Sequence, residues 1–186
     1  MIIAVVGSGG KTTLIKKLAA QYRAAGKTVL ITTSTHMFIE EDTLLTDDAE
    51  QIVRALGEQG CVMAGVPEGI KIKALSGQTF AAACAAADVV LVEADGSKRM
   101  PLKYPNATEP VIPENTDEII VVWGPHGLHK PAREVCHRLE LAMACLGIEE
   151  DTRITREHVA VLVQKGYLEP LGRKYPGAKL TVHPPL

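Results

Sequence analysis

Cysteines are few in this sequence, and none of them has the spacing of a metal or redox site. The four cysteines are Cys61, Cys84, Cys136 and Cys145. They form no C-x-x-C pair and lie among apolar residues, a pattern that argues against a cysteine metal site. It is typical of small buried side chains in a reducing cytosol. We therefore expect a cytoplasmic protein.

Neither sign of charge predominates, and long apolar runs are absent. The chain has 20 Lys and Arg against 22 Asp and Glu, so no broad positive field attracts nucleic acid or anionic lipid. The longest run of low polarity, residues 80–92, is interrupted by Asp88 and is too short to span a bilayer. Residues 2–6 lack the basic lead and cleavage site of a secretory signal. We expect no nucleic-acid or membrane partner.

Internal repeats are also absent, and the periodicity predicts a single α/β domain over residues 1–186. Strands that alternate with helices predict three layers around a mostly parallel central sheet, as in P-loop nucleoside triphosphatases. A helix ended by Gly26 joins the first two strands in a β-α-β unit. The predicted strands are 2–6, 27–33, 88–92, 118–123 and 179–182, with a hairpin of 61–66 and 70–74. The predicted helices are 12–25, 47–57, 77–87, one from Val135 to about Gly147, and one from Thr155 to Gly166.

The most informative segment is residues 4–13, where an apolar strand runs into a glycine turn and a helix. Three glycines lack the Cβ that blocks positive φ, so the turn can direct consecutive backbone N–H groups at one anion. The helix N-terminus also favours negative charge. Lys11 would reach the β and γ phosphates, and the Thr12 hydroxyl would bind Mg²⁺. The predicted nucleotide-binding residues are Gly7, Ser8, Gly9, Gly10, Lys11, Thr12 and Thr13.

This motif departs from the full phosphate-loop signature, which has a glycine where this chain has Val5. The shorter form, Gly-x-x-Gly-Lys-Thr-Thr, is the one that Mur-ligase-type enzymes use. The alternative is a glycine turn that only joins a strand to a helix. A dinucleotide fingerprint is disfavoured, because its third glycine would fall at Thr12 and hydroxyl residues 32–35 replace the expected acid.

An acidic pair follows the apolar strand near residue 90. Glu93 and Asp95 lie at its carboxyl end, the edge where open α/β sheets bind ligands. Because two adjacent carboxylates repel each other, a cation between them explains the pair. We expect one or both to hold Mg²⁺ or to orient water, without deciding which. The alternative is an Asp-Gly turn beside a solvated glutamate.

Basic residues open the proline-rich loop that follows, residues 95–115. Lys98, Arg99 and then Lys103 could clamp a transferred phosphate or an anionic substrate. Solvated loop charge is the alternative. His36, at the end of the second strand, could position water or a second substrate. Trp123 is expected in the core.

These segments resemble the YqeC family, accessory proteins of selenium-dependent molybdenum hydroxylases. The resemblance rests on residues 6–13, on 32–37, and above all on Glu-Ala-Asp-Gly-Ser-Lys-Arg-Met-Pro-Leu-Lys at 93–103. It extends to 109–113, to 137–141 and to the helix after Thr155. It implies a nucleotide-binding protein that acts in maturation of a molybdenum enzyme, with the hydroxylase or its cofactor as partner. Members continue into a further strand and an Asn-Lys-x-Asp-like segment, whereas this sequence ends at Leu186. The resemblance therefore does not imply a preference for adenine or guanine.

The sequence therefore predicts an Mg²⁺-dependent ATP- or GTP-binding protein, an NTP hydrolase or phosphoryl transferase. Lys11, Glu93 and Asp95 would act on the phosphates and metal, and Lys98 and Arg99 on the second ligand. One alternative is a non-catalytic, nucleotide-gated chaperone with the proline-rich loop as its switch. Another is a fragment of a Mur-type ligase. A homodimer is compatible with the sequence, although no motif specifies one.

Overall fold

The computed structural model describes all 186 residues, which divide into two compact units. The first unit comprises Met1–Val5, Thr12–Ala94 and Val111–Asp117. The second comprises Val6–Lys11, Asp95–Pro110 and Glu118–Leu186. The chain thus passes several times between them, and the single domain expected over residues 1–186 stays a prediction.

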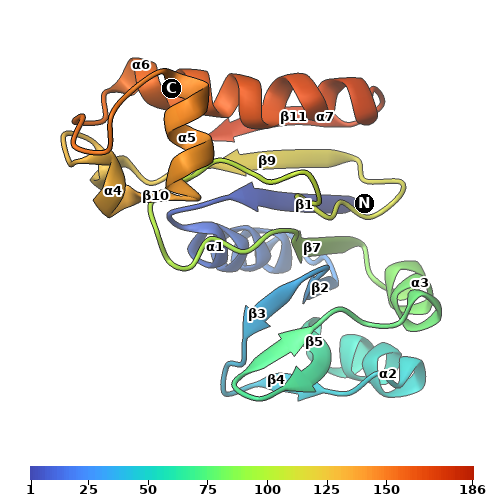
Figure 1. Ribbon diagram of the computed structural model, residues 1–186. Helices are drawn as coiled ribbons and strands as arrows, with labels where there is room; N and C mark the ends of the chain where they lie inside the picture. The colour runs from blue at the N-terminus through green and yellow to red at the C-terminus, as the bar shows by residue number, and fades with distance from the viewer. The chain divides into compact units, whose positions relative to one another are not determined.

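The first unit is a mixed α/β structure, as the sequence predicts (Figure 1). Strand β1 ends, and helix α1 begins, in the second unit, since Val6–Lys11 belongs there. The bounds of the predicted elements agree with the observed ones to within a few residues, whereas the short strands β3 and β4 were not predicted. The elements are β1 (Ile2–Gly7), α1 (Lys11–Ala24), β2 (Val29–Thr33), β3 (His36–Phe38), β4 (Thr43–Leu45), α2 (Ala49–Gln59), β5 (Cys61–Glu68), β6 (Lys71–Lys73), α3 (Gly77–Ala86) and β7 (Val89–Glu93).

The sheet of the first unit is mostly parallel, which confirms the predicted arrangement. Its strand order is β1-β7-β2-β5-β6-β3, and β4 pairs with β5. The pairs β1–β7, β7–β2, β2–β5 and β4–β5 are parallel. The predicted hairpin is the antiparallel pair β5–β6, and β3 continues it antiparallel to β6.

Strand β7 lies between β1 and β2, and its sequence explains that position. All five of its residues are buried, as expected for a parallel strand that is covered on both faces. Its last residue, Glu93, pairs in register with Val5 on one side and Thr33 on the other. The last residue of β7 is therefore a buried glutamate, located at the carboxyl edge of the sheet.

The second unit contains the rest of the secondary structure. Strands β9 and β11 are parallel partners, so the strand predicted at 179–182 is confirmed. Trp123 is buried as predicted, 2% exposed, and its indole N–H donates to the Pro184 carbonyl at 2.7 Å. The elements are β8 (Leu102–Lys103), β9 (Glu118–Val122), the 3₁₀ turn η1 (Pro125–Gly127), α4 (Ala132–Val135), β10 (Cys136–His137), α5 (Leu139–Leu146), α6 (Arg156–Val163), the π-helical turn η2 (Gln164–Leu168), α7 (Glu169–Lys174) and β11 (Lys179–His183).

The helix predicted from Val135 to about Gly147 ends as predicted, but its predicted start is wrong, because α4 ends at Val135 and α5 begins only at Leu139. Between α4 and α5, β10 pairs in parallel with β8 of the proline-rich loop. Arg138 then has a left-handed backbone, with φ 62°, which no α-helix interior accepts. A pairing with a strand more than thirty residues earlier overrides the local helical period.

The helical stop predicted at Gly166 is also wrong. The helix continues from α6 through η2 into α7, with Gly166 buried inside η2. A Cβ at this position would lie 3.0 Å from Cδ of Pro105 and 3.3 Å from the Tyr104 ring. Gly166 therefore permits close packing against the proline-rich loop instead of ending the helix.

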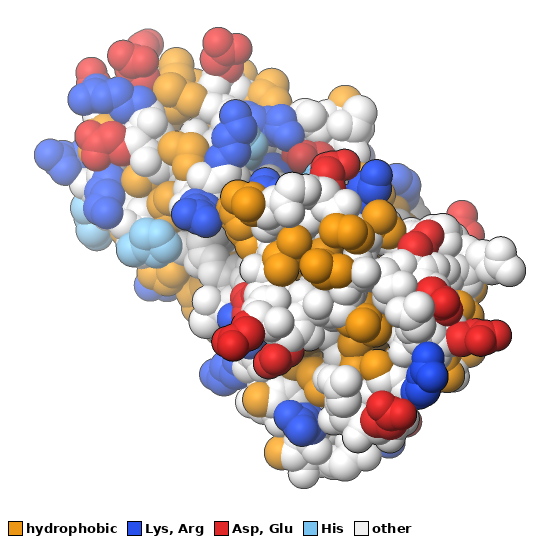
Figure 2. Space-filling view, turned by 90° about the horizontal axis from the view of Figure 1, so that it is seen from below, with side chains coloured by type: hydrophobic (Ala, Val, Ile, Leu, Met, Phe, Trp, Pro, Cys, Tyr) orange, Lys and Arg blue, Asp and Glu red, His pale blue; other side chains and the backbone are white.

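The surface carries both signs of charge. Figure 2 shows Lys and Arg side chains interspersed with Asp and Glu on the face that it presents, in keeping with a formal net charge of −2. None of the helices combines the length and the apolar character that crossing a membrane requires.

Candidate functional site

Residues 7–11, here called the glycine loop, curl as their composition predicts. Gly7, Gly9 and Gly10 have φ of 89°, 79° and 138°, values that a residue with a Cβ rarely adopts. Ser8 is buried, and its N–H donates to the Val122 carbonyl at 2.8 Å. The loop leads directly into α1, which begins at Lys11.

At two of these positions a side chain would also collide with neighbouring backbone atoms. A Cβ on Gly7 would overlap the Val122 carbonyl oxygen. A Cβ on Gly9 would lie 2.5 Å from Gly124 Cα and 2.6 Å from the Pro101 carbonyl oxygen. The backbone of the glycine loop is thus fixed against β9 and the residues around it.

Lys11 is buried at the end of the glycine loop, with 4% of its surface exposed. Its ammonium group donates to the Gly7 carbonyl at 2.8 Å and lies 3.1 Å from Oδ1 of Asp95. The contact with Asp95 is an ion pair without hydrogen-bond geometry, since Oδ1 accepts no hydrogen bond. The lysine is therefore held on the loop by one carbonyl and one charge.

Asp95 is fully buried and lies at the centre of the site. Its Oδ2 accepts the Gly7 N–H at 3.0 Å and the Tyr167 hydroxyl at 3.1 Å, and it lies 3.2 Å from the Lys103 ammonium group. A buried carboxylate is tolerated when cations and N–H or O–H donors compensate its charge. Here Asp95 ties the glycine loop to α6–α7 through Tyr167 and to β8 through Lys103.

The ionic network continues beyond Lys103, whose side chain is 0% exposed. Its ammonium group donates to the Gly96 carbonyl at 2.5 Å and pairs with Glu109 at 2.7 Å. Arg138 donates to the same Glu109 oxygen at 2.6 Å. We call Lys11, Asp95, Lys103, Glu109 and Arg138 the charge cluster. Three cations face two carboxylates, so the cluster carries one surplus positive charge beside the glycine loop.

The pKa values around the cluster reflect this balance. Burial raises the pKa of Glu109, but hydrogen bonds from Lys103 and Arg138 outweigh burial and lower it overall. Burial, followed by the charges of Arg138, Lys103 and Lys98, lowers the pKa of His137. Burial and the neighbouring Asp95 raise the pKa of Tyr167 well above its ordinary value. Glu109 is thus ionised, His137 neutral and Tyr167 a hydrogen-bond donor near pH 7.

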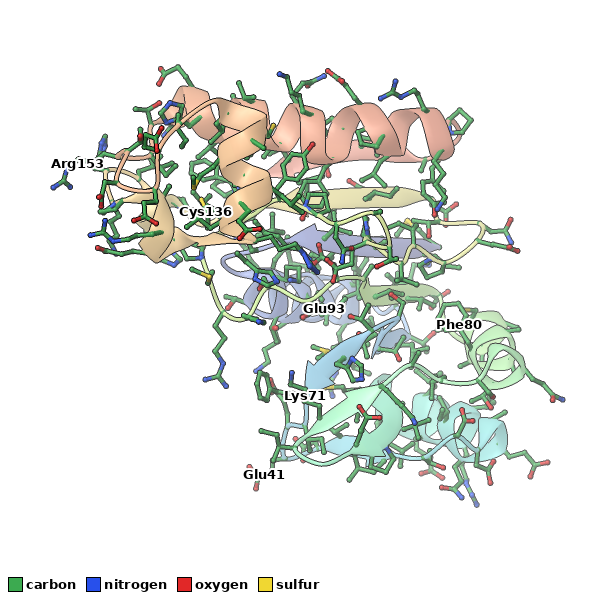
Figure 3. All side chains as sticks on the ribbon, viewed as in Figure 1. Glu41, Lys71, Phe80, Glu93, Cys136 and Arg153 are labelled. Carbon is green, nitrogen blue, oxygen red and sulfur yellow. The ribbon has the colours of Figure 1, made fainter.

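A second pair of predicted residues meets in the first unit. Thr12 donates from its hydroxyl to Oε2 of Glu93 at 2.9 Å. Glu93 is 8% exposed at the end of β7 (Figure 3), which excludes the solvated glutamate of the alternative interpretation. The Glu93 backbone carbonyl accepts the Thr33 hydroxyl at 2.8 Å.

These residues fit a magnesium ion, although no preformed cage exists. No three His, Cys, Asp or Glu side chains are grouped to hold a metal ion. Mg²⁺ keeps several waters and binds through one or two carboxylates together with substrate phosphates, so it needs no such cage. The hydroxyl of Thr12 and the carboxylate of Glu93 supply oxygen ligands of the type that Mg²⁺ takes.

Comparison with known proteins gives the chain a family. The family model described as "YqeC protein" matches residues 3–140. The chain belongs to the YqeC family. It is 33% identical over 180 residues to "Uncharacterized protein YqeC" of Escherichia coli (strain K12), an alignment that covers 88% of this chain and 67% of that protein. The range that matches the YqeC model includes the glycine loop and every member of the charge cluster.

Several residues that the sequence predicts for the site lie outside the charge cluster. Lys98 and Arg99 are exposed on a turn, both with positive φ. Lys98 is near enough to His137 to affect its pKa. Thr13 is exposed on α1, and Nε2 of His36 lies 2.7 Å from a carboxylate oxygen of Glu68. The ligand role of Lys98 and Arg99 stays a prediction.

Sequence reasoning missed Glu109, Arg138 and Tyr167, and underrated Lys103. Tyr167 lies 72 residues after Asp95 in the chain, so no local spacing links the two. The available signal was the resemblance to the YqeC family, which takes in 93–103, 109–113 and 137–141. Three of these four residues fall in those segments.

Proposed function

We propose that this protein is an Mg²⁺-dependent nucleoside triphosphatase that hydrolyses ATP or GTP or transfers its γ-phosphoryl group. The observation that carries the proposal is the glycine loop with Lys11 at its end, beside the fully buried Asp95. Backbone N–H groups of residues 9–11, at the start of α1, favour a polyanion. The surplus positive charge of the cluster supports the same ligand.

The contacts of Lys11 suggest how phosphate is accepted. The ammonium group must exchange the Gly7 carbonyl and Asp95 for phosphate oxygens. Asp95 would keep Lys103, the Gly7 N–H and the Tyr167 hydroxyl, so its buried charge stays compensated during the exchange. Lys11 can therefore move to a phosphate without leaving the buried Asp95 carboxylate unpaired.

Thr12 and Glu93 would hold the metal ion. Bound Mg²⁺ would neutralise charge that develops on the phosphates. Glu93 or Asp95 remains the candidate to orient the attacking water or hydroxyl group. Lys98 and Arg99, on the exposed turn after Gly96, would clamp the transferred phosphate.

The biological role in the proposal comes from the family resemblance. It supports a role for the proposed triphosphatase in maturation of a selenium-dependent molybdenum hydroxylase or its cofactor. A nucleotide-gated chaperone is the second candidate, favoured by one observation: Asp95, Lys103 and Glu109 all belong to the proline-rich loop. A nucleotide that draws Lys11 away would thus act directly on that loop.

Phosphate release from Mg·ATP and Mg·GTP tests the proposal. The isolated protein should release phosphate with repeated turnover, and release should stop when Mg²⁺ is chelated. Nucleotide binding without turnover would exclude hydrolysis by the isolated protein and leave phosphoryl transfer to a second substrate or the gated chaperone. No binding of either nucleotide would contradict both.

A further inference from the structure

The second unit contains a cavity of about 600 Å³ that the proposed nucleotide site does not use. Its walls are residues 104–110 of the proline-rich loop together with side chains from α5, η2 and α7. None of its lining residues belongs to the glycine loop. The volume lies within the range of small-molecule sites, about 300 to 1,000 Å³.

Rings and aliphatic groups form much of the lining. Tyr104 and Tyr175 contribute aromatic rings, and Leu141 contributes an aliphatic side chain that is 41% exposed. Proline rings from the loop and from α7 complete these walls. Such surfaces pack against a flat apolar group.

The charged groups of the lining favour an anion. Lys165 and Lys174 are both exposed, and neither forms an ion pair. Lys174 lies over the Tyr175 ring, 5.4 Å from its centroid. The lining carboxylate, Glu109, already accepts hydrogen bonds from Arg138 and pairs with Lys103. The lining thus has two lysines without an ion-pair partner, whereas its one carboxylate is already paired with two cations.

Glu109 also connects this cavity to the glycine loop. It pairs with Lys103 at 2.7 Å, Lys103 lies 3.2 Å from Asp95, and Asp95 lies 3.1 Å from Lys11. An occupant of the cavity would thus contact a residue of the charge cluster. Three consecutive ion pairs separate that residue from the phosphate-binding lysine.

We propose that the cavity binds a small anionic molecule with a flat apolar ring system, and that this molecule is the second substrate. Its role as second substrate rests on the proposed function. The binding preference of the cavity does not, because it follows from the lining alone. The ring would lie among Tyr104, Leu141 and Tyr175, and the anionic group would pair with Lys165 and Lys174.

Two dyes of nearly the same shape test this preference without nucleotide. Anilinonaphthalene sulfonate is anionic, and N-phenylnaphthylamine is its uncharged counterpart. The sulfonate should bind with a stoichiometry of one, measured by fluorescence titration of the full chain. The double variant Lys165→Gln/Lys174→Gln should bind the sulfonate about tenfold more weakly and the uncharged dye as before, because only the charged contacts are lost.

Two further variants complete the test. Lys130→Gln removes an exposed lysine of the second unit that does not line the cavity, and it should bind both dyes as the wild type does. Leu141→Trp fills the cavity and should weaken both dyes. Equal sulfonate binding by the lysine variant and the wild type would overturn the proposal. Undiminished binding of both dyes by Leu141→Trp would also overturn it.

The outcome separates this inference from the proposed function. Lys11→Ala should leave dye binding unchanged, since Lys11 does not line the cavity. If the wild type binds no nucleotide but shows the expected dye pattern, the proposed function fails and the anionic site stands. If nucleotide binds and the dye pattern is absent, the anionic site fails alone.

Discussion

Lys11 and Asp95 form an ion pair of 3.1 Å between Nζ and Oδ1, with side chains only 4% and 0% exposed. Burial makes each partner dependent on the other, because an unpaired charge is costly away from water. In the proposed function, phosphate binding would separate this pair, whereas stability requires the charge of Asp95 to remain compensated. Substitutions at the two residues should therefore have different effects.

Lys11→Ala should weaken the binding of Mg·ATP or Mg·GTP by roughly 10- to 100-fold, the effect of losing one charged hydrogen bond of about 1.5 to 3 kcal/mol. Isothermal titration calorimetry measures the change. Lys17→Ala is the matched control, because Lys17 is an exposed lysine of the same helix. Equal nucleotide affinities of the Lys11 and Lys17 variants would show that Lys11 does not bind the nucleotide.

Asp95→Asn should destabilise the protein by about 3 kcal/mol, since it leaves Lys11 and Lys103 facing a neutral group in the interior. Urea denaturation measures the free energy of unfolding. Asp42→Asn, at an exposed position, should change it by less than about 0.5 kcal/mol. Asp95→Asn/Lys103→Met should recover part of the loss, because it lowers the excess of cations over carboxylates in the charge cluster. A double variant no more stable than Asp95→Asn would argue against coupling of the two residues.

The sequence predicted the features that depend on local pattern. The period of apolar residues located α1, β2 and the β5–β6 hairpin, because burial of one face or both faces dictates it. The glycines predicted the positive φ at Gly7 and Gly9. The apolar run that ends at Glu93 predicted a carboxylate at the carboxyl end of a strand, and Glu93 is the last residue of β7.

Features that depend on distant partners were not predictable in the same way. Arg138 interrupts a helical pattern because β10 pairs with β8, a contact that no window of sequence reveals. A glycine such as Gly166 often ends a helix, yet here its missing side chain allows Tyr104 and Pro105 to pack against the helix. The sequence identified Asp95 as an acid of the site, but its partner Tyr167 is joined to it by the fold alone.

The stability of the protein should fall as the pH falls below about 6.5, the ordinary pKa of histidine, because of His137. The pKa of His137 is lowered in the folded state, so the folded protein binds fewer protons than the unfolded chain between the two values. The loss therefore begins near 6.5 and levels off below the lowered pKa. Glu109, whose pKa is also lowered, adds a second loss that begins below about 4.5.

Urea denaturation of the wild type and of His137→Gln at several pH values between 7 and 5 checks the upper window. The variant should lose less stability across it, because it lacks the group that is protonated on unfolding. His126→Gln, at an exposed position, serves as the control and should follow the wild type. Parallel curves for the wild type and His137→Gln would assign the pH dependence to other groups.

Gly9→Ala and Gly57→Ala should have opposite effects on the free energy of unfolding. Gly9 has φ of 79°, and a Cβ there would lie 2.5 Å from Gly124 Cα. A left-handed backbone costs an alanine about 1 to 2 kcal/mol before any overlap is counted. Gly57 lies inside α2 with nothing within 4 Å of an added Cβ, so alanine should stabilise there by about 0.5 to 1 kcal/mol. Because Gly9 shapes the glycine loop, Gly9→Ala should also weaken nucleotide binding, whereas Gly57→Ala should not. A Gly9→Ala variant with wild-type stability and affinity would show that the loop tolerates a backbone different from the one described.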